Sequence, residues 1–302
     1  MSGFVRLATF LDLIKFTHSI FALPFALFAT VIGIKHIWST APAHQWLGRL
    51  GLIVVAMIIA RTVAMTVNRL ADRALDAANP RTAQRPSVTG SVSPFFMRAI
   101  IILGTLGFAL VASAFWWLYA NPWPTLLALP VLGWLALYSY TKRATWLCHY
   151  VLGISLALAP LAAWIALVPP YGPLWDLRVL LLAGAVVFWV AGFDILYALQ
   201  DEDFDRQHHL HSIPARFGRT RALWISRLSH IVTIGFLIAL GWWGGLHGIY
   251  WLGCALAVVL LGFEQSLVSP RDISKVNVAF MTVNGWLGML YCALGILAAL
   301  WA

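Results

Sequence analysis

The stretch 178–205 of this chain, RVLLLAGAVVFWVAGFDILYALQDEDFD, joins a long apolar segment to a cluster of acidic residues. A membrane-spanning helix needs roughly 20 predominantly apolar residues, and 178–198 meets that length. On a continuing helix, spacings of four place Tyr197, Asp201 and Asp205 on one face. Ionised carboxylates are costly at the end of a membrane span, so we expect cations to lie between them.

A second acidic cluster, NRLADRALD at 68–76, also follows an apolar segment and has the same spacing of four in Asn68, Asp72 and Asp76. Together the two clusters hold seven of the chain's eleven acidic residues: Asp72, Asp76, Asp194, Asp201, Glu202, Asp203 and Asp205. Carboxylate and amide oxygens are the ligands that hard cations such as Mg²⁺ prefer. The sequence therefore predicts two helix ends that bind a divalent metal and, through the metal, a diphosphate.

The composition predicts an all-α, polytopic membrane protein. Hydrophobic residues make up 61% of the chain and charged residues 10%, whereas about one quarter of a soluble domain is charged. Nine apolar segments are long enough to cross a bilayer, at about 17–38, 46–67, 95–118, 123–140, 147–168, 178–198, 222–244, 248–268 and 278–301. The acidic clusters end segments two and six, which predicts two four-helix halves plus a ninth helix around a central cavity. Residues 1–302 are expected to form one integral-membrane domain.

The distribution of basic residues predicts the orientation. Loops after segments two, four, six and eight carry most of the Arg and Lys, whereas the opposite side has little beyond Lys35, Arg49 and Arg178. By the positive-inside rule, the N-terminus and both acidic clusters face the cytoplasm and the C-terminus lies outside. The membrane is expected to be a bacterial inner membrane. The formal net charge of +9 is mostly this bias of the loops, strengthened by anionic membrane lipid. It implies no nucleic-acid partner, because the basic residues lie in membrane-adjacent loops among acidic ones. Residues 4–16 are expected to form an amphipathic helix on the membrane surface.

Several basic residues near the acidic clusters have two interpretations each. Arg81 and Arg85 in NPRTAQRPSVTG (79–90) and Lys142 in YSYTKRAT (138–145) either clamp phosphate oxygens or anchor helices at the membrane surface. Arg61 lies two helical turns deeper than Asn68, and an arginine within the membrane needs a partner. That partner is the carboxylate of a bound substrate, a structural Asp or a backbone carbonyl.

The histidines and cysteines are not expected to bind metal. Neighbouring oxygen ligands favour Mg²⁺ over a transition metal near His208, His209 and His211, which are expected to lie in a solvated loop. The three cysteines occur singly, without metal-ligand spacing, and are expected to pack within the helices.

The acidic motifs and the residues that follow them resemble the signatures of the UbiA superfamily of intramembrane aromatic prenyltransferases. Asn68-xxx-Asp72-xxx-Asp76, followed by NPRTxxRP, is similar to the first signature. Asp194-xx-Tyr197-xxx-Asp201-xxx-Asp205, followed by SIPxxFG at 212–218, is similar to the second, and YSYTKR resembles a third shared element. The chain departs from the pattern at Arg69, where many members have Asp, and at His209, where Gly is common.

The resemblance implies a role for each matching residue. Mg²⁺ on the allylic diphosphate would be held by Asn68, Asp72, Asp76, Asp194, Asp201 and Asp205. Within that set, the catalytic residues would be Asp72, Asp76, Asp201 and Asp205. The diphosphate would be contacted by Arg81, Arg85 and Lys142, the carboxylate of an aromatic acid by Arg61, and the substrates also by Tyr138 and Tyr197.

The implied activity is the Mg²⁺-dependent transfer of a polyprenyl group from a polyprenyl diphosphate to the ring of 4-hydroxybenzoate, in respiratory quinone biosynthesis. A dihydroxynaphthoate, the acceptor in menaquinone biosynthesis, is the alternative substrate. A polytopic transporter is the alternative of a different class, although it would not need metal-spaced carboxylates beside arginines. CDP-alcohol phosphotransferases also use Asp-rich helices, but their DGxxAR spacing is absent from this chain.

Overall fold

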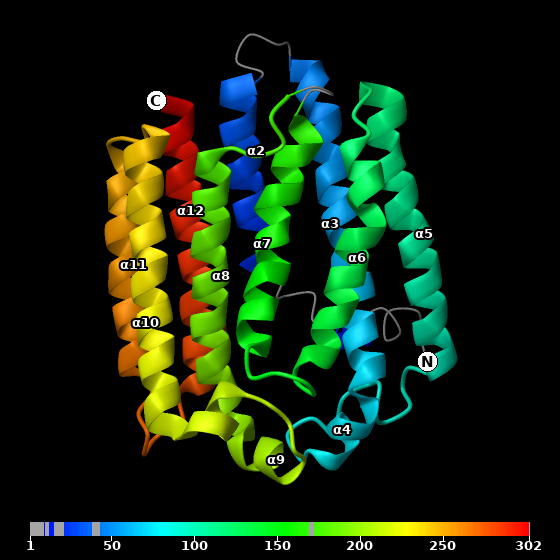
Figure 1. Ribbon diagram of the computed structural model, residues 1–302, viewed down its shortest axis with the longest axis vertical. Coiled ribbons are helices and arrows are strands. Elements are labelled where there is room, and N and C mark those ends of the chain that lie inside the picture. The colour runs from blue at the N-terminus through cyan, green and yellow to red at the C-terminus, as the bar shows by residue number, and fades with distance from the viewer. Residues whose placement is uncertain (1–8, 10–11, 15–20, 38–42, 169–171, 302) are drawn as a thin grey trace. The chain divides into compact units, whose positions relative to one another are not determined.

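The computed structural model describes residues 9, 12–14, 21–37, 43–168 and 172–301, and this part of the chain contains helices and no strand (Figure 1). The expected surface helix at 4–16 and the start of the first apolar segment lie mostly outside the described residues. The elements follow in the order α2 (Leu23–Ile37), α3 (Ala43–Ala71), α4 (Arg73–Ala78), α5 (Pro94–Tyr119), α6 (Trp123–Thr141), α7 (Cys148–Leu167), α8 (Leu177–Ala198), η2 (Leu199–Asp201), α9 (Glu202–Gln207), α10 (Ile213–Gly244), α11 (Ile249–Ser266), η3 (Val278–Val283) and α12 (Asn284–Trp301).

The all-α, polytopic class expected from the sequence is confirmed. Seven helical segments of the described chain are long and apolar enough to cross a membrane: Trp46–Ala71, Pro94–Tyr119, Cys148–Leu167, Leu177–Gln207, Ile213–Gly244, Ile249–Ser266 and Val278–Trp301. The first apolar helix, Leu23–Lys35, is shorter, and α6 is not among the seven. The number of nine spans therefore remains a prediction.

The chain divides into two compact units. Unit 1 comprises the described residues within 1–19 and 49–140, and unit 2 those within 20–48 and 141–302. This division differs from the expected halves, because α2 and the first residues of α3 belong with the later helices, whereas the rest of α3 belongs to unit 1. In unit 2, the Phe28 ring of α2 lies edge-on to Tyr291 of α12 at 6.1 Å, and α2 also packs on α7. The aromatic packing of α2, which helical periodicity alone does not reveal, explains its assignment to unit 2.

Helix α8 is the central helix of unit 2, with α7 and α10 as its main neighbours (Figure 1). Two glycines allow close approach. A Cβ at Gly153 of α7 would lie 2.3 Å from the backbone oxygen of Val187, and one at Gly192 of α8 would lie 2.2 Å from the ring of His230 on α10. Within a membrane the hydrophobic effect does not drive helices together, and small residues allow the close van der Waals packing that does. The helix that carries Asp194 is thus held tightly on two sides.

In unit 1, α3 packs on α5, since a Cβ at Gly104 of α5 would meet Val63 of α3 at 2.5 Å. Helix α5 begins at a Ser93 cap, whose hydroxyl accepts from the backbone N–H of Phe96, with Pro94 at the first helical position. The Ser93 cap and Pro94 mark the point where the polar loop 79–92 ends and the next apolar helix begins.

Candidate functional site

The first acidic motif lies where α3 passes into α4 in unit 1. The backbone N–H of Asp72 donates to Asn68 O at 2.9 Å, and that of Asp76 donates to Asp72 O at 2.7 Å. Helical spacing therefore continues through the junction at Asp72. The amide of Asn68 donates from Nδ2 to Asp72 Oδ2 at 3.0 Å, so the first two members of the motif are in direct contact, as their spacing predicts.

Asp76 is the buried member of this motif, with 6% of its surface exposed. Its Oδ1 pairs with Arg85 Nη1 at 2.6 Å, and its backbone oxygen accepts from Thr82 Oγ1 at 3.1 Å. The loop after Asn79 thus returns over the acidic helix end. Asp76 Oδ2 is buried and has no hydrogen-bond partner. A buried carboxylate oxygen without a donor is costly, and a bound cation would satisfy it.

Arg69, which replaces a potential acidic ligand, has a structural role in unit 1. Its Nη1 donates to Asn68 Oδ1 at 3.2 Å and its Nε to the backbone oxygen of Leu13 at 3.3 Å. Only 6% of its surface is exposed. Arg69 therefore orients the Asn68 amide and ties α3 to an earlier part of unit 1.

The other predicted binding residues of unit 1 are more accessible. Arg61 and Tyr138 are half-buried on α3 and α6, and Arg81 is exposed, with its backbone N–H bonded to Asn79 Oδ1 at 3.0 Å. Arg81 and Arg85 both follow the acidic helix end, but only Arg85 forms the ion pair with Asp76. The substrate roles of these residues remain predictions.

The second acidic motif, in unit 2, is not one continuous α-helix. Helix α8 ends at Ala198 after carrying Asp194 and Tyr197, the short 3₁₀ helix η2 covers Leu199–Asp201, and α9 carries Asp205. Because a 3₁₀ helix has three residues per turn, it rotates the side chains that follow it. The single helical face expected for Tyr197, Asp201 and Asp205 is therefore interrupted, and Asp201 and Asp205 are both buried.

Asp205 is completely buried and both of its carboxylate oxygens are engaged. Oδ2 accepts from Ser212 Oγ at 2.7 Å, and Oδ1 pairs with Lys142 Nζ at 2.7 Å. The backbone oxygen of Lys142 accepts from His211 N at 2.7 Å, so Lys142 and the start of the SIP segment meet around Asp205. Sequence analysis did not identify Ser212, although a serine before Ile-Pro is a helix-cap signal that could have marked it.

The charge of Lys142 is stabilised by this contact. Burial lowers the pKa of Lys142, but the charge of Asp205, its hydrogen bond and the charge of Asp201 raise it further, so that the pKa lies above its usual value of 10.5. Lys142 is thus a fixed cation at neutral pH.

The remaining acids and the tyrosine of this motif have other partners. Glu202 is buried and pairs with Arg206 at 2.7 Å and Arg219 at 2.9 Å, which makes it a structural residue. The ring of Tyr197 lies 4.2 Å from that of Phe280, centroid to centroid. The carboxylate of Asp194 accepts through Oδ2 from His149 Nδ1 at 2.6 Å, a contact that nothing in the sequence indicated.

The histidines at 208, 209 and 211 are exposed, as expected for a solvated loop. His208 stacks on Phe204, with ring centroids 3.9 Å apart. His209 has a φ of 53°, in the left-handed region that glycine adopts readily. The departure from glycine at this position therefore preserves the left-handed turn.

Among the described residues, no group of three or more His, Cys, Asp or Glu side chains could by itself hold a metal ion. Magnesium is commonly bound through one or two carboxylates, with substrate phosphates and water as the other ligands. The oxygen donors of both motifs fit that mode, and the unpartnered Oδ2 of Asp76 is a specific position for a cation. Asp205 fits less directly, because Lys142 and Ser212 already occupy its two oxygens.

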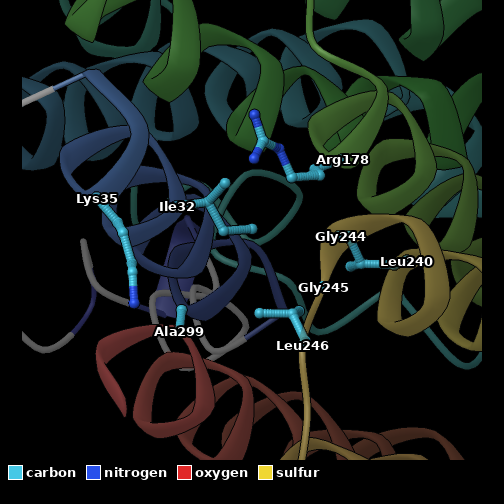
Figure 2. A pocket seen from close by; sticks show the side chains of 8 residues that line it. All are labelled: Ile32, Lys35, Arg178, Leu240, Gly244, Gly245, Leu246 and Ala299. Carbon is cyan, nitrogen blue, oxygen red and sulfur yellow. The ribbon is translucent and has the colours of Figure 1, made fainter. Parts of the chain in front are cut away.

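A cavity of about 230 Å³ lies at the other end of α8 in unit 2 (Figure 2). It is lined by Ile32, Lys35, Arg178, Leu240, Gly244, Gly245, Leu246 and Ala299. Arg178 is paired there with Asp176 through two hydrogen bonds, at 2.7 Å and 2.6 Å. None of the predicted site residues lines this cavity.

Comparison with known proteins identifies relatives over nearly the whole chain. Residues 26–301 match the UbiA prenyltransferase family. A 4-hydroxybenzoate octaprenyltransferase of Chromohalobacter salexigens is 30% identical over 272 residues, which cover 88% of this chain and 85% of the relative. Another protein of that name, from Edwardsiella ictaluri, is 33% identical over 264 residues, with 86% of each chain covered.

Solved structures agree with this comparison. The apo structure of a UbiA homolog from Aeropyrum pernix K1 aligns with a TM-score of 0.80 and 30% identity, and covers 93% of this chain and 97% of the homolog. A UbiA homolog from Archaeoglobus fulgidus, bound to DMAPP and Mg²⁺, aligns with a TM-score of 0.68 over 96% of this chain and 99% of its own. At 20% identity, that second likeness concerns the fold.

Proposed function

Because this chain belongs to the UbiA prenyltransferase family, we propose that it transfers a polyprenyl group from an allylic polyprenyl diphosphate to the ring of 4-hydroxybenzoate. The choice of 4-hydroxybenzoate as the acceptor rests on the similarity to 4-hydroxybenzoate octaprenyltransferases, at 30% and 33% identity over most of both chains. The reaction would supply a ubiquinone precursor in a bacterial inner membrane.

Both acidic motifs would bind the diphosphate head with Mg²⁺. The residues assigned to the metal are Asn68, Asp72, Asp76, Asp194, Asp201 and Asp205. When bound, Mg²⁺ acts as a Lewis acid that neutralises the charge of the departing diphosphate. The buried, unpartnered Oδ2 of Asp76 supports this assignment, because it lacks the positive charge or donor that a carboxylate oxygen needs.

The proposed phosphate-binding cations are Arg81, Arg85 and Lys142. Arg85 and Lys142 each pair with a proposed metal ligand, Asp76 at 2.6 Å and Asp205 at 2.7 Å. These ion pairs balance charge while no substrate is bound. When the substrate binds, Arg85 and Lys142 would leave these carboxylates and pair with the diphosphate instead. Fixed positive charge stabilises the leaving group most as the allylic C–O bond breaks and its charge grows.

The acceptor would be held through its carboxylate by Arg61, with Tyr138 and Tyr197 as further substrate contacts. Breaking the C–O bond leaves the electron pair on the diphosphate and an allylic cation on the prenyl group. The ring carbon ortho to the phenolic oxygen supplies the electron pair of the new C–C bond, and the ring then loses its proton. The prenyl chain and the product both belong in lipid, which suits an integral membrane enzyme.

Orientation follows from the loop charges. The loops that carry both acidic motifs also hold most of the Arg and Lys, which favours a site that opens toward the cytoplasm. The water-soluble acceptor would then enter from the cytosol, and the polyprenyl diphosphate would lie with its head group at the cytoplasmic surface and its prenyl tail in the bilayer.

The test is turnover by the purified full-length protein in lipid nanodiscs. Polyprenyl diphosphate and Mg²⁺ are supplied with either 4-hydroxybenzoate or a dihydroxynaphthoate, and the prenylated product is identified by mass. We expect product with 4-hydroxybenzoate, its loss with EDTA, and loss of turnover in Asp72→Ala and Asp201→Ala with unchanged unfolding temperature. If product forms from the naphthoate and not from 4-hydroxybenzoate, the proposed acceptor is wrong. If turnover continues in EDTA, the proposed dependence on Mg²⁺ is wrong.

A further inference from the structure

His149 lies in the first turn of α7 in unit 2, with 2% of its surface exposed. Both ring nitrogens have partners. Nδ1 lies 2.6 Å from Asp194 Oδ2, and Nε2 lies 3.2 Å from the backbone N of Ile213. The imidazole thus connects α7 to the acidic residue of α8 and to the first residue of α10.

The second contact determines which nitrogen carries the proton. The backbone N–H of Ile213 can only donate, so Nε2 must accept and has no hydrogen. The proton of the neutral ring therefore resides on Nδ1, which donates to Asp194. A histidine whose far nitrogen accepts from the main chain is fixed in both tautomer and ring orientation.

Asp194 is held from one side only. Its side chain is 23% exposed, whereas that of His149 is 3% exposed, so the histidine lies on the buried side of the carboxylate. Oδ2 receives the histidine proton, and Oδ1 has no partner among the described residues. A carboxylate that is fixed through one oxygen and open at the other has one oxygen available for a metal.

We propose that His149 is a positioning residue, which holds Asp194 with Oδ1 oriented for Mg²⁺ on the diphosphate. This inference rests on the proposed function, in which Asp194 is a metal ligand. Residues that orient metal-binding carboxylates typically change metal affinity by about 10- to 100-fold when they are replaced. The effect of His149 should therefore appear in Mg²⁺ binding before it appears in the chemical step.

Two variants separate this role from a structural one. In His149→Asn, the amide nitrogen occupies nearly the position of Nδ1 and can still donate to Asp194. In His149→Gln, the amide oxygen can reach the Nε2 position and accept from Ile213, but Asp194 loses its donor. His230→Asn is the matched control, because His230 is a buried histidine of the same unit that packs against α8 at Gly192 and contacts Gln265, but does not contact the Asp194 carboxylate.

The experiment measures Mg²⁺ binding without turnover. The full-length protein in nanodiscs is titrated with Mg²⁺ at a fixed concentration of geranyl S-thiolodiphosphate, a slowly reacting substrate analogue, and the unfolding temperature is followed. The Mg²⁺ dependence of turnover is then measured separately. We expect His149→Gln to raise the Mg²⁺ concentration for half-maximal stabilisation by about 10-fold or more, and His149→Asn and His230→Asn to leave it within about 2-fold of wild type.

Each outcome decides the inference. Equal losses of Mg²⁺ affinity in His149→Asn and His149→Gln, or no loss in His149→Gln, would overturn it. Asp194→Asn identifies the origin of a failure. If Asp194→Asn binds Mg²⁺ like wild type, the metal role of Asp194 in the proposed function is wrong. If Asp194→Asn loses affinity while His149→Gln does not, only the positioning role is wrong.

Discussion

Replacing Lys142 by Met tests whether its ion pair with Asp205 holds unit 2 together at the second acidic motif. Lys142 Nζ lies 2.7 Å from Asp205 Oδ1, and the lysine side chain is 37% exposed while that of Asp205 is fully buried. Methionine retains the apolar length of lysine and removes its charge. Asp205 would then keep only the hydrogen bond from Ser212.

The expected loss of stability follows from how far the side chains of Lys142 and Asp205 are exposed to solvent. Breaking a fully buried ion pair by removing one partner costs about 3–5 kcal/mol, because the other charge stays buried. Water reaches more than a third of the lysine side chain, which screens part of this interaction, so we expect about 2 kcal/mol. Asp205→Asn removes the opposite charge and retains an oxygen for Ser212. The double variant Lys142→Met/Asp205→Asn should therefore be more stable than the sum of the single changes predicts, by about 1–2 kcal/mol.

The assay is thermal unfolding of all four proteins in the same detergent. For a chain of this size, a loss of 1 kcal/mol lowers the unfolding temperature by about 2 °C, so Lys142→Met should unfold about 4 °C below wild type. Additive losses, with the double variant least stable by the sum of the two, would show that the two side chains do not interact. Unchanged stability in Lys142→Met would show that Asp205 needs no cation.

The same variant gives a pH test with a defined sign. The pKa of Lys142 is raised above 10.5 in the folded protein. Its contribution to stability is therefore complete below about pH 10.5 and is lost as the pH rises through the folded-state pKa. The difference in unfolding temperature between wild type and Lys142→Met should stay constant from about pH 7 to pH 10 and shrink above that range. A difference that shrinks below pH 9 would contradict the raised pKa.

Three further changes test other parts of the fold and site. Gly153→Ala should lower stability by about 2–3 kcal/mol, since its Cβ would lie 2.3 Å from a backbone oxygen of α8; Gly235→Ala, with open space around the Cβ, is the control in thermal unfolding and should not be destabilised. Ser212→Ala removes both a helix cap and a donor to Asp205, and should cost about 1–2 kcal/mol in the same assay. Arg61→Ala should raise the KM for 4-hydroxybenzoate about 10-fold with little change in kcat, as expected for the loss of a charged hydrogen bond; an unchanged KM would remove Arg61 from the acceptor site.

Sequence patterns predicted the helical elements because those depend on local features. The length of an apolar run determines whether a helix can span a bilayer, and Pro94 with Ser93 marks the start of α5. The contact between Asn68 and Asp72 likewise follows from a spacing of four on one helix. Both acidic motifs could be found in the same way, since each is a short run with a regular spacing.

Pattern reasoning was least accurate where the backbone departs from regular geometry. A continuous helix was expected through Asp201, but η2 interrupts it there. The change from 3.6 to three residues per turn alters every side-chain direction that follows. Nothing in the order DILYALQDEDFD distinguishes Glu202, which is paired with two arginines, from its acidic neighbours.

The sequence by itself determined that this chain is a bundle of membrane helices with two carboxylate motifs at helix ends. Only the tertiary structure decided what each carboxylate contacts: Arg85 for Asp76, Lys142 and Ser212 for Asp205, and His149 for Asp194. The physical reason is the range of the forces involved. Helix formation and membrane insertion depend on neighbouring residues along the chain. The contacts of Lys142 with Asp205 and of His149 with Asp194 instead require segments far apart in sequence to pack in one register, and those of Arg85 with Asp76 and of Ser212 with Asp205 require a loop to fold back on the acidic helix. In unit 2, close approach at Gly153 and Gly192 helps to fix that register.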